Sequence, residues 1–232
     1  MYPVFFIAVI FLLPKKNYDY IIFIMAVIDM KTAGFAAVIL AGGQSRRMGR
    51  NKAEITFNGK RTIDILAEKL KDFEDIMISS DMELKVEGCR NIKDIYKEKG
   101  PASGILSALR ETKARALFVT ACDMPLIKES TVKKICSIYS LYNEGNEGID
   151  AAVIKTSQGI NPLFGVYGKD TADIFERNII SGELSVKKIL SGMRVVLVDA
   201  ETITDDENEF LNMNTPDDCL RIKKVFYENR CQ

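Results

Sequence analysis

The chain has 232 residues, of which 47% are hydrophobic and 28% are charged, a balance typical of a globular protein with a substantial core. Lysine plus arginine and aspartate plus glutamate each number 32, so the formal net charge is zero and a general nucleic-acid binder is not expected. Histidine is absent, which excludes a Ser-His-Asp triad, a Cys-His dyad and a zinc site with histidine ligands.

The cysteines indicate a reducing environment. There are five, an odd number, and no two of them have the C-x-x-C spacing, so neither a zinc cluster nor a disulfide framework is expected. Buried free thiols are the simplest interpretation, and we expect a cytoplasmic protein.

The amino-terminal segment is unusually apolar. Its two apolar runs, residues 2–13 and 21–28, are separated by PKKNYDY, and each is shorter than the roughly 18 consecutive apolar residues of a membrane-spanning helix. No positive stretch precedes the first run, as it would in a signal peptide. A weak membrane anchor, an added packing segment and a start codon assigned too early remain open. Because Met30 lies just before the first strong strand, we favour a dispensable or non-native extension at 1–29, a domain at 30–232 and no membrane association.

From residue 36 onward, short apolar runs alternate with amphipathic segments. The runs predict strands at 36–40, 76–79, 116–121, 150–154 and 194–198. The amphipathic segments predict helices at 63–70, 101–109, 128–142, 170–180 and 185–191, and a last one that begins at Pro216 behind a Thr215 cap. This alternation implies a single Rossmann-like α/β domain with a mostly parallel sheet flanked by helices. Ligands of such sheets bind beyond the carboxyl ends of the strands, here after Leu40, Ser79 and Ala121.

The loop after Leu40 reads AGGQSRRMGRNKA. Gly42 and Gly43 allow the backbone to turn sharply, and exposed backbone N–H groups there can bind phosphate oxygens. Four cations follow within seven residues: Arg46, Arg47, Arg50 and Lys52. Neither the Walker A motif nor the dinucleotide motif fits this loop. A phosphate-binding loop is favoured, with a solvated basic turn as the alternative.

A second candidate loop, Cys122-Asp123-Met124-Pro125, follows the strand ALFVTA. A carboxylate at the end of a strand is well placed to bind Mg²⁺, which takes a few carboxylate oxygens together with substrate phosphates. An aspartate that caps a turn or helix before a proline fits the same residues.

Two further segments contain polar candidates. Asp94 precedes GPASGILSAL and could equally be a surface turn residue. Asn212 and Asn214 could hydrogen-bond a second substrate or a metal shell, or could serve as turn and capping residues.

These motifs, in order over residues 35 to about 228, resemble those of the MobA-type nucleotidyltransferases. LAGGQSRRMGRNKA matches the pattern LAGGxSxRMGxDKA except at Asn51, where the family usually has Asp, which puts a minor role in ordering the loop in doubt. CDMP is similar to the family's metal-binding element. Asp94 with GPASGILSAL is similar to D…GPLxGIxxAL, with Ala102 in place of the usual Leu. NPLFGVY resembles P-L-x-G-x-Y, and FLNMNTPDD resembles F-x-N-x-N-T-P-x-D/E-L.

The resemblance implies a role for each matching residue. On the nucleotide side it implies contacts from Leu40, Ala41, Gly42, Gly43, Lys52, Asp94 and Asp123. Lys52 and Arg47 would stabilise the leaving diphosphate, and Asp123 would hold Mg²⁺ and act with them in catalysis. On the acceptor side it implies Asn161, Pro162, Asn212 and Asn214.

The implied reaction transfers GMP from GTP to Mo-molybdopterin and releases diphosphate, which forms the guanine dinucleotide form of the molybdenum cofactor. Contacts with other molybdenum cofactor enzymes are implied as well. Transfer from CTP to molybdopterin, or of a nucleotidyl group to a sugar or polyol phosphate, would fit the same motifs. A non-catalytic nucleotide-binding module is a further alternative, which would be expected to lack residues such as Lys52 and Asp123.

Overall fold

The computed structural model divides the chain into two units, residues 1–31 and 32–232. The structure describes Thr32 alone and then residues 34–42, 51–144 and 148–228. The predicted extension at 1–29 therefore lies outside the described residues, and its separation from the domain stays a prediction. No helix in the described part of the chain is long and apolar enough to cross a membrane.

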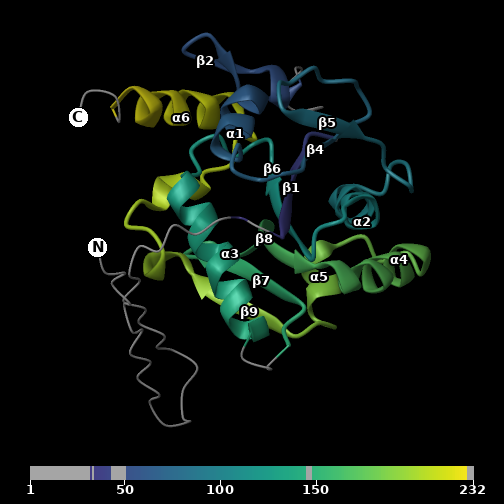
Figure 1. Cartoon of the computed structure of the whole chain (residues 1–232). Helices are drawn as coiled ribbons and strands as arrows, with labels where there is room; N and C mark the ends of the chain where they lie inside the picture. Colours follow the sequence, from purple (N-terminus) through teal and green to yellow (C-terminus); the bar gives the residue numbers. More distant parts are fainter. Residues whose placement is uncertain (1–31, 33, 43–50, 145–147, 229–232) are drawn as a thin grey trace, which may run out of the picture. The chain divides into compact units, whose positions relative to one another are not determined.

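Seven strands form one sheet in the order β5-β4-β1-β6-β8-β7-β9 (Figure 1). They are β1 (Phe35–Leu40), β4 (Ile76–Ser79), β5 (Cys89–Ile92), β6 (Ala116–Ala121), β7 (Ala151–Thr156), β8 (Gly159–Gly168) and β9 (Val195–Asp199). Among these described strands, only β8 runs antiparallel to its neighbours. The prediction of a mostly parallel sheet flanked by helices is confirmed.

Helices cover both faces of this sheet, as the alternating pattern predicts (Figure 1). One face packs against α2 (Pro101–Glu111), α4 (Ala172–Ile180) and α5 (Val186–Leu190). The other face packs against α1 (Thr62–Lys69) and α3 (Glu129–Glu144).

The central strand β1 shows why an unbroken apolar run was needed. Successive side chains of a strand point to opposite faces. Phe35, Ala37 and Ile39 enter the core under α1 and α3, whereas Ala36 and Val38 enter the core under α2. Every residue of β1 is buried, as expected of a parallel strand covered on both faces.

The carboxyl ends of four parallel strands meet at one edge of the sheet. Leu40, the last residue of β1, is paired with Ser79 of β4 on one side and with Ala121 of β6 on the other. Ser79 is paired in turn with Ile92, the last residue of β5. The loops that follow these strands therefore begin side by side, and the expected ligand edge is the edge that the fold builds.

The sequence pattern gives no strand over residues 159–168, where β8 lies. Pro162 cannot donate a hydrogen bond to a ladder, and it lies where the register between β7 and β8 shifts. A Cβ at Gly165 would lie 2.6 Å from the carbonyl oxygen of Ala152, so this strand also requires a residue that strands usually avoid. Because Phe164 pairs with Thr120 near the end of β6, the first residues of β8 extend past β6 at the ligand edge.

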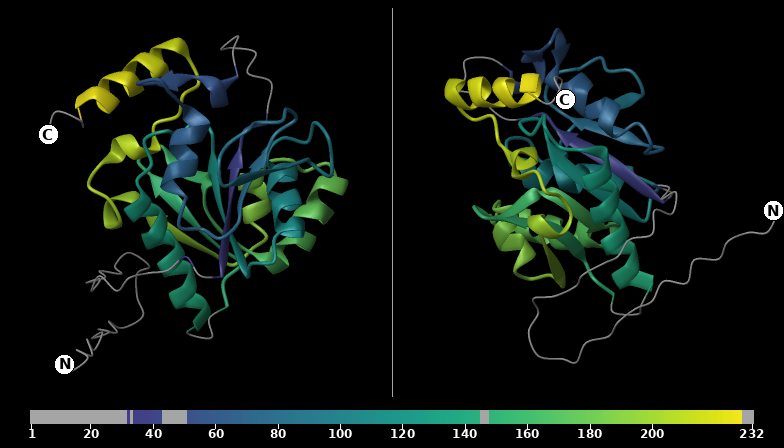
Figure 2. Two further views of the ribbon diagram at one scale, coloured as in Figure 1. Left: turned by 45° about the horizontal axis from the view of Figure 1, so that its top comes forward. Right: turned by 90° about the vertical axis from the view of Figure 1, so that its left-hand side faces the viewer.

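The helix α6 (Pro216–Glu228) packs against a small hairpin of β2 (Thr56–Phe57) and β3 (Lys60–Arg61) (Figure 2). The rings of Phe57 and Phe226 stack with centroids 5.8 Å apart, and Ile222 is fully buried beneath them. The predicted start of α6 at Pro216 is confirmed.

Candidate active site

Lys52 and Asp123 lie together at the carboxyl edge of the sheet. The Nζ atom of Lys52 is 3.1 Å from Oδ2 of Asp123, and both side chains are about one-fifth exposed. The same ammonium group donates a hydrogen bond to Oδ1 of Asn214 at 2.7 Å. Three segments far apart in the sequence thus meet at one cation.

Asn51 positions Lys52. The backbone there forms a short 3-10 helix, Lys52–Glu54, and the Oδ1 atom of Asn51 accepts a hydrogen bond from the N–H of Ala53 at 3.0 Å. An amide oxygen caps a helix start about as well as a carboxylate does. The departure from the family's usual Asp therefore leaves the local order of this turn intact.

Three hydrogen bonds hold the loop around Asp123. The N–H of Cys122 donates to the carbonyl oxygen of Leu40 at 3.0 Å, and the N–H of Met213 donates to the carbonyl oxygen of Asp123 at 2.9 Å. From α1, the ammonium group of Lys69 donates to the carbonyl oxygen of Pro125 at 2.7 Å. Burial lowers the pKa of Lys69 to about 8. The sheet, α1 and the carboxyl-terminal segment all fix the direction of the Asp123 carboxylate.

Asn214 is held in place by the start of α6. The carboxylate of Asp218 accepts hydrogen bonds from the N–H groups of Asn214 and Thr215, at 3.0 and 2.8 Å. The hydroxyl of Thr215 accepts in return from the N–H of Asp218 at 3.2 Å, a reciprocal capping arrangement. The hydrogen bond to Thr215 lowers the pKa of Asp218, so this carboxylate stays ionised. Thr215 is a cap, as predicted, whereas the side chain of Asn214 is left to contact Lys52.

The residues expected to contact the nucleotide begin at the end of β1. The N–H of Ala41 donates to the carbonyl oxygen of Ser79 at 2.8 Å, which ties the loop after Leu40 to β4. Gly42 is exposed, and a Cβ added there would meet only that Ser79 oxygen, at 3.8 Å. The backbone at Gly42 is therefore open to a ligand. Gly43 and Arg47 fall within 43–50, outside the described residues.

Asp94 lies beside the same strand ends. Its Oδ1 atom accepts a hydrogen bond from the hydroxyl of Ser79 at 2.7 Å, and burial raises the pKa of the Asp94 carboxyl. Helix α2 approaches closely here, because a Cβ at Gly104 would lie 2.6 Å from Oγ of Ser79 and 2.8 Å from Cδ2 of Leu40. Only glycine lets α2 pack this tightly against Ser79, whose hydroxyl holds Asp94 at the carboxyl edge of the sheet.

The donor atoms suit a metal ion that also binds a substrate. In the described part of the chain, no group of three or more His, Cys, Asp or Glu side chains could hold a metal ion on its own. Within these residues, Oδ2 of Asp123 is bound by Lys52 while Oδ1 has no hydrogen-bonding partner. A single carboxylate oxygen at an edge where a phosphate-bearing ligand is expected fits Mg²⁺, which takes few protein ligands and completes its shell with water and phosphate oxygens.

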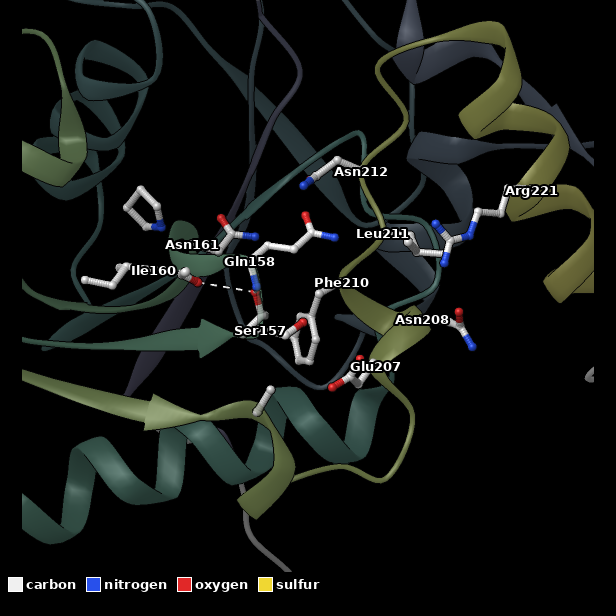
Figure 3. Close-up of a pocket in the computed structure, with 14 residues that line it drawn as sticks. Ser157, Gln158, Ile160, Asn161, Glu207, Asn208, Phe210, Leu211, Asn212 and Arg221 are labelled. Carbon is white, nitrogen blue, oxygen red and sulfur yellow. Dashed lines mark hydrogen bonds between the residues drawn. The ribbon is translucent and has the colours of Figure 1, made fainter. Parts of the chain in front are cut away.

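A pocket of about 270 Å³ lies between the β7–β8 turn, the 3-10 turn at Glu207–Phe210 and α6 (Figure 3). It is lined by Thr156, Ser157, Gln158, Gly159, Ile160, Asn161, Pro162, Ala200, Glu207, Asn208, Phe210, Leu211, Asn212 and Arg221. Of the expected acceptor residues, Asn161, Pro162 and Asn212 therefore line one pocket. Asn214 is not part of its lining and contacts Lys52 instead.

The pocket and the Lys52–Asp123 pair share one wall. The Nδ2 atom of Asn161 lies 3.3 Å from the sulfur of Met124, the residue after Asp123. Met213, which follows Asn212, is bonded through its N–H to the Asp123 carbonyl. Two pocket residues are therefore close to the Asp123 loop: Asn161 contacts Met124, and Asn212 precedes Met213, whose N–H is hydrogen-bonded to Asp123.

Four further residues shape this region, and none of them is among the predicted site residues. Ser79 and Gly104 fix Asp94 and the strand ends, and Gln158 and Arg221 line the pocket. Ser79 is the last residue before one of the loops predicted to bind a ligand, and Gly104 lies inside the GPASGILSAL segment. Gln158 and Arg221 belong to no motif, and nothing local in the sequence marks them.

Comparisons with known proteins show which family the chain belongs to. The family profile of the MobA-like NTP transferase domain matches residues 37–197. A probable molybdenum cofactor guanylyltransferase of Geobacillus sp. (strain WCH70) is 32% identical over 191 residues, which cover 79% of this chain and 95% of that protein. One of Clostridium perfringens (strain 13 / Type A) is 34% identical over 201 residues, covering 82% of this chain and 98% of that protein.

A solved structure has the same fold. The molybdopterin-guanine dinucleotide biosynthesis protein A of Archaeoglobus fulgidus superimposes with a TM-score of 0.69 at 29% identity, and the match covers 83% of this chain and 99% of that one. The resemblance to this family is thereby confirmed. The chain belongs to the MobA-like NTP transferase family and is a nucleotidyltransferase.

Proposed function

We propose that this protein transfers GMP from GTP to Mo-molybdopterin, which makes it a molybdenum cofactor guanylyltransferase. The observation that carries this proposal is the meeting of Lys52, Asp123 and Asn214 at the carboxyl edge of the sheet, beside a pocket large enough for part of a second substrate. The names of the relatives support guanine as the base and molybdopterin as the acceptor.

The reaction needs positioning more than proton transfer. A phosphate oxygen of the acceptor attacks the α-phosphorus of the triphosphate, a new P–O bond forms there, and the bond to the β-phosphate breaks as diphosphate leaves. The attacking phosphate is already anionic, so no general base has to remove a proton. A chain without histidine can therefore catalyse this step through orientation and charge neutralisation.

Lys52 supplies the fixed positive charge. Its ammonium group is held by Asp123 and Asn214, so it can stabilise the negative charge that develops on the leaving diphosphate without first reorganising. Arg47, which lies outside the described residues, is proposed to assist it. The exposed backbone at Gly42 and the half-buried carboxyl of Asp94 are proposed to contact the phosphates and the base or ribose, respectively.

Asp123 is proposed to hold the metal ion. Nucleotidyltransferases of this family typically use a divalent metal, and we propose Mg²⁺. When bound, such an ion supplies Lewis-acid polarisation of the phosphoryl oxygens. The contribution of the chain is a carboxylate whose direction is fixed by the bonds of its loop to Leu40 and Met213.

Asn161, Pro162 and Asn212 are proposed to receive the acceptor, because they line the pocket next to Asp123. We also propose that the protein works in the cytoplasm and meets other enzymes of molybdenum cofactor synthesis. Fractionation of cells would test the first statement, since recovery in the membrane fraction would contradict it.

The decisive experiment is a turnover assay of the full chain with molybdopterin and Mg²⁺, supplied with GTP or CTP in parallel. We expect release of diphosphate and formation of the guanine dinucleotide with GTP, and at least about tenfold lower kcat/KM with CTP. Preference for CTP, or turnover only with a sugar or polyol phosphate, would replace this proposal by the related transferase. Binding of GTP without any turnover would favour a nucleotide-binding module.

A further inference from the structure

The pocket is lined by polar side chains that have no protein partner. Arg221 projects from α6, and within the described residues its guanidinium forms no ion pair and no hydrogen bond. The same holds for the side-chain amides of Gln158, in the turn between β7 and β8, and of Asn212. These residues line one pocket from three different segments (Figure 3). Hydrogen-bond donors and acceptors that have no protein partner and line one cavity are typical of a binding site.

The pocket lining carries one positive charge, on Arg221, and one negative charge, on Glu207. Glu207 is exposed at the pocket, and the carboxylate of this residue forms no ion pair with any described residue. Arg221 offers up to five N–H donors to an anion, whereas Glu207 accepts N–H donors. A ligand that satisfies both would have an anionic group and, elsewhere, an edge of N–H donors.

The remaining lining includes apolar side chains. Pro162, Phe210 and Leu211 contribute apolar surface, and Phe210 is largely buried. A carboxamide presents a donor and an acceptor side by side, which matches the N–H and C=O groups on the edge of a planar heterocycle. Gln158 and Asn212 could therefore hydrogen-bond to the edge of a planar heterocycle while the ring of that heterocycle packs against the apolar side chains.

We propose that Arg221, Gln158 and Asn212 select the acceptor by binding its planar, N–H-bearing head group, with Arg221 on the anionic side of that group. This rests on the proposed function, in which the acceptor has a pterin head that carries an anionic metal dithiolene and a phosphate at the other end. The phosphate would point toward Asp123, since Asn161 and Met213 connect the pocket to that loop. Arg221 is thus a specificity residue and takes no part in the chemical step.

The test compares Arg221→Ala and Arg221→Lys with the wild-type chain. Alanine is well tolerated in a helix, so the fold of α6 is expected to persist. We expect Arg221→Ala to raise the KM for molybdopterin roughly ten- to hundredfold, which is the loss expected for a charged hydrogen bond, and to change kcat little. The Kd for GTP with Mg²⁺ should stay within about twofold, and Arg221→Lys should restore part of the acceptor affinity.

Lys223→Ala is the matched control, because Lys223 is an exposed cation on the same helix and does not line the pocket. An unchanged acceptor KM in Arg221→Ala, or an equal rise in Lys223→Ala, would overturn the inference. Binding of molybdopterin without nucleotide, measured by equilibrium dialysis, separates this inference from the proposed function. If the wild-type chain forms no dinucleotide but binds molybdopterin in an Arg221-dependent way, only the proposed reaction fails. If wild-type and Arg221→Ala chains bind it equally, the selecting role of Arg221 fails.

Discussion

The two halves of the candidate site are built differently. The nucleotide half consists of strand ends and tight backbone approaches: the loop after Leu40 is tied to Ser79, and Gly104 brings α2 against both. The acceptor half is a pocket of side chains supplied by the β7–β8 turn, a 3-10 turn at Glu207–Phe210 and α6. Under the proposed function, the backbone would bind phosphate, which every nucleotide carries, whereas side chains would recognise what distinguishes one acceptor from another.

The loop Cys122–Pro125 lies between the two halves and belongs to both. On one side it is bonded to Leu40, and on the other it is bonded to Met213 and contacted by Asn161. Substitutions in this loop and at Lys52 should therefore impair both substrates, whereas substitutions in either half should impair one.

The largest effect is expected from substitutions of Lys52 and Asp123, which lie between the two halves. Lys52→Ala removes the cation that contacts Asp123, and Asp123→Ala removes the carboxylate proposed to hold the metal. Each should lower kcat by roughly 10²- to 10³-fold, as loss of a preorganised charge typically does, with little change in the melting temperature. Turnover assays and thermal unfolding on the same preparations would measure this.

Lys71→Ala, at an exposed lysine outside the site, is the matched control and should retain wild-type kcat. Full activity of Asp123→Ala would remove the carboxylate from the mechanism. It would also remove the reason for treating the loop as the junction of the two halves.

A smaller effect, confined to the nucleotide half, is expected from Gly104→Ala. The added Cβ would clash with the side chains of Ser79 and Leu40, and such overpacking costs about 1–3 kcal/mol in the free energy of unfolding. Displacement of Ser79 should also weaken GTP binding, measured as Kd, while the KM for the acceptor stays unchanged. Gly192→Ala, where the nearest atom would be 3.7 Å away, should be nearly neutral. An acceptor KM that rises as much as the GTP Kd would contradict the separation of the two halves.

The smallest expected effect is a change in the pH dependence of stability. It concerns Lys69 of α1, whose ammonium group donates a hydrogen bond to the carbonyl oxygen of Pro125. Burial lowers the pKa of Lys69 to about 8, so between about pH 8 and the ordinary pKa near 10.5 the unfolded chain binds more protons than the folded one. This group therefore makes the wild-type chain more stable as the pH rises through that window. In Lys69→Met the contribution is absent, and other titrating groups cancel in the comparison.

The stability of Lys69→Met relative to the wild type should thus fall by about 1–2 kcal/mol from pH 7.5 to pH 10, measured by urea unfolding. A difference that does not depend on pH would show that Lys69 is solvated enough to keep its ordinary pKa. Loss of activity with both substrates, but with the fold intact, would place Lys69 with the shared loop.

Much of the nucleotide half could be predicted from the sequence. The strand at 116–121 is an unbroken apolar run, and the glycines and cations after Leu40 form one contiguous loop. Local signals of this kind are sufficient because the carboxyl ends of parallel strands necessarily meet at one edge. The pairing of Leu40 with both Ser79 and Ala121 places the predicted loops beside one another.

The acceptor half could be predicted only in part. Asn161 and Asn212 were found through the family resemblance, but β8 was missed because Pro162 and Gly165 interrupt its pattern. The proline is tolerated because it lies at a register shift, and the glycine is required because the backbone of β7 lies close to it. Both reasons depend on the partner strand, which the sequence does not reveal.

By itself, the sequence predicted five of the seven strands of the main sheet, the helices between them, the glycine- and arginine-rich loop after Leu40 and the carboxylate after β6, since each depends on residues adjacent in the chain. Only the tertiary structure decided that Lys52 would contact Asp123 and Asn214, and that Gln158 and Arg221 would line one pocket. The physical reason is that these contacts join segments distant in the chain. The pairing of β1 with β6 brings Lys52 to Asp123, whereas the antiparallel β8 and the packing of α6 on the β2–β3 hairpin place Gln158, Asn214 and Arg221 through burial of shared apolar surface.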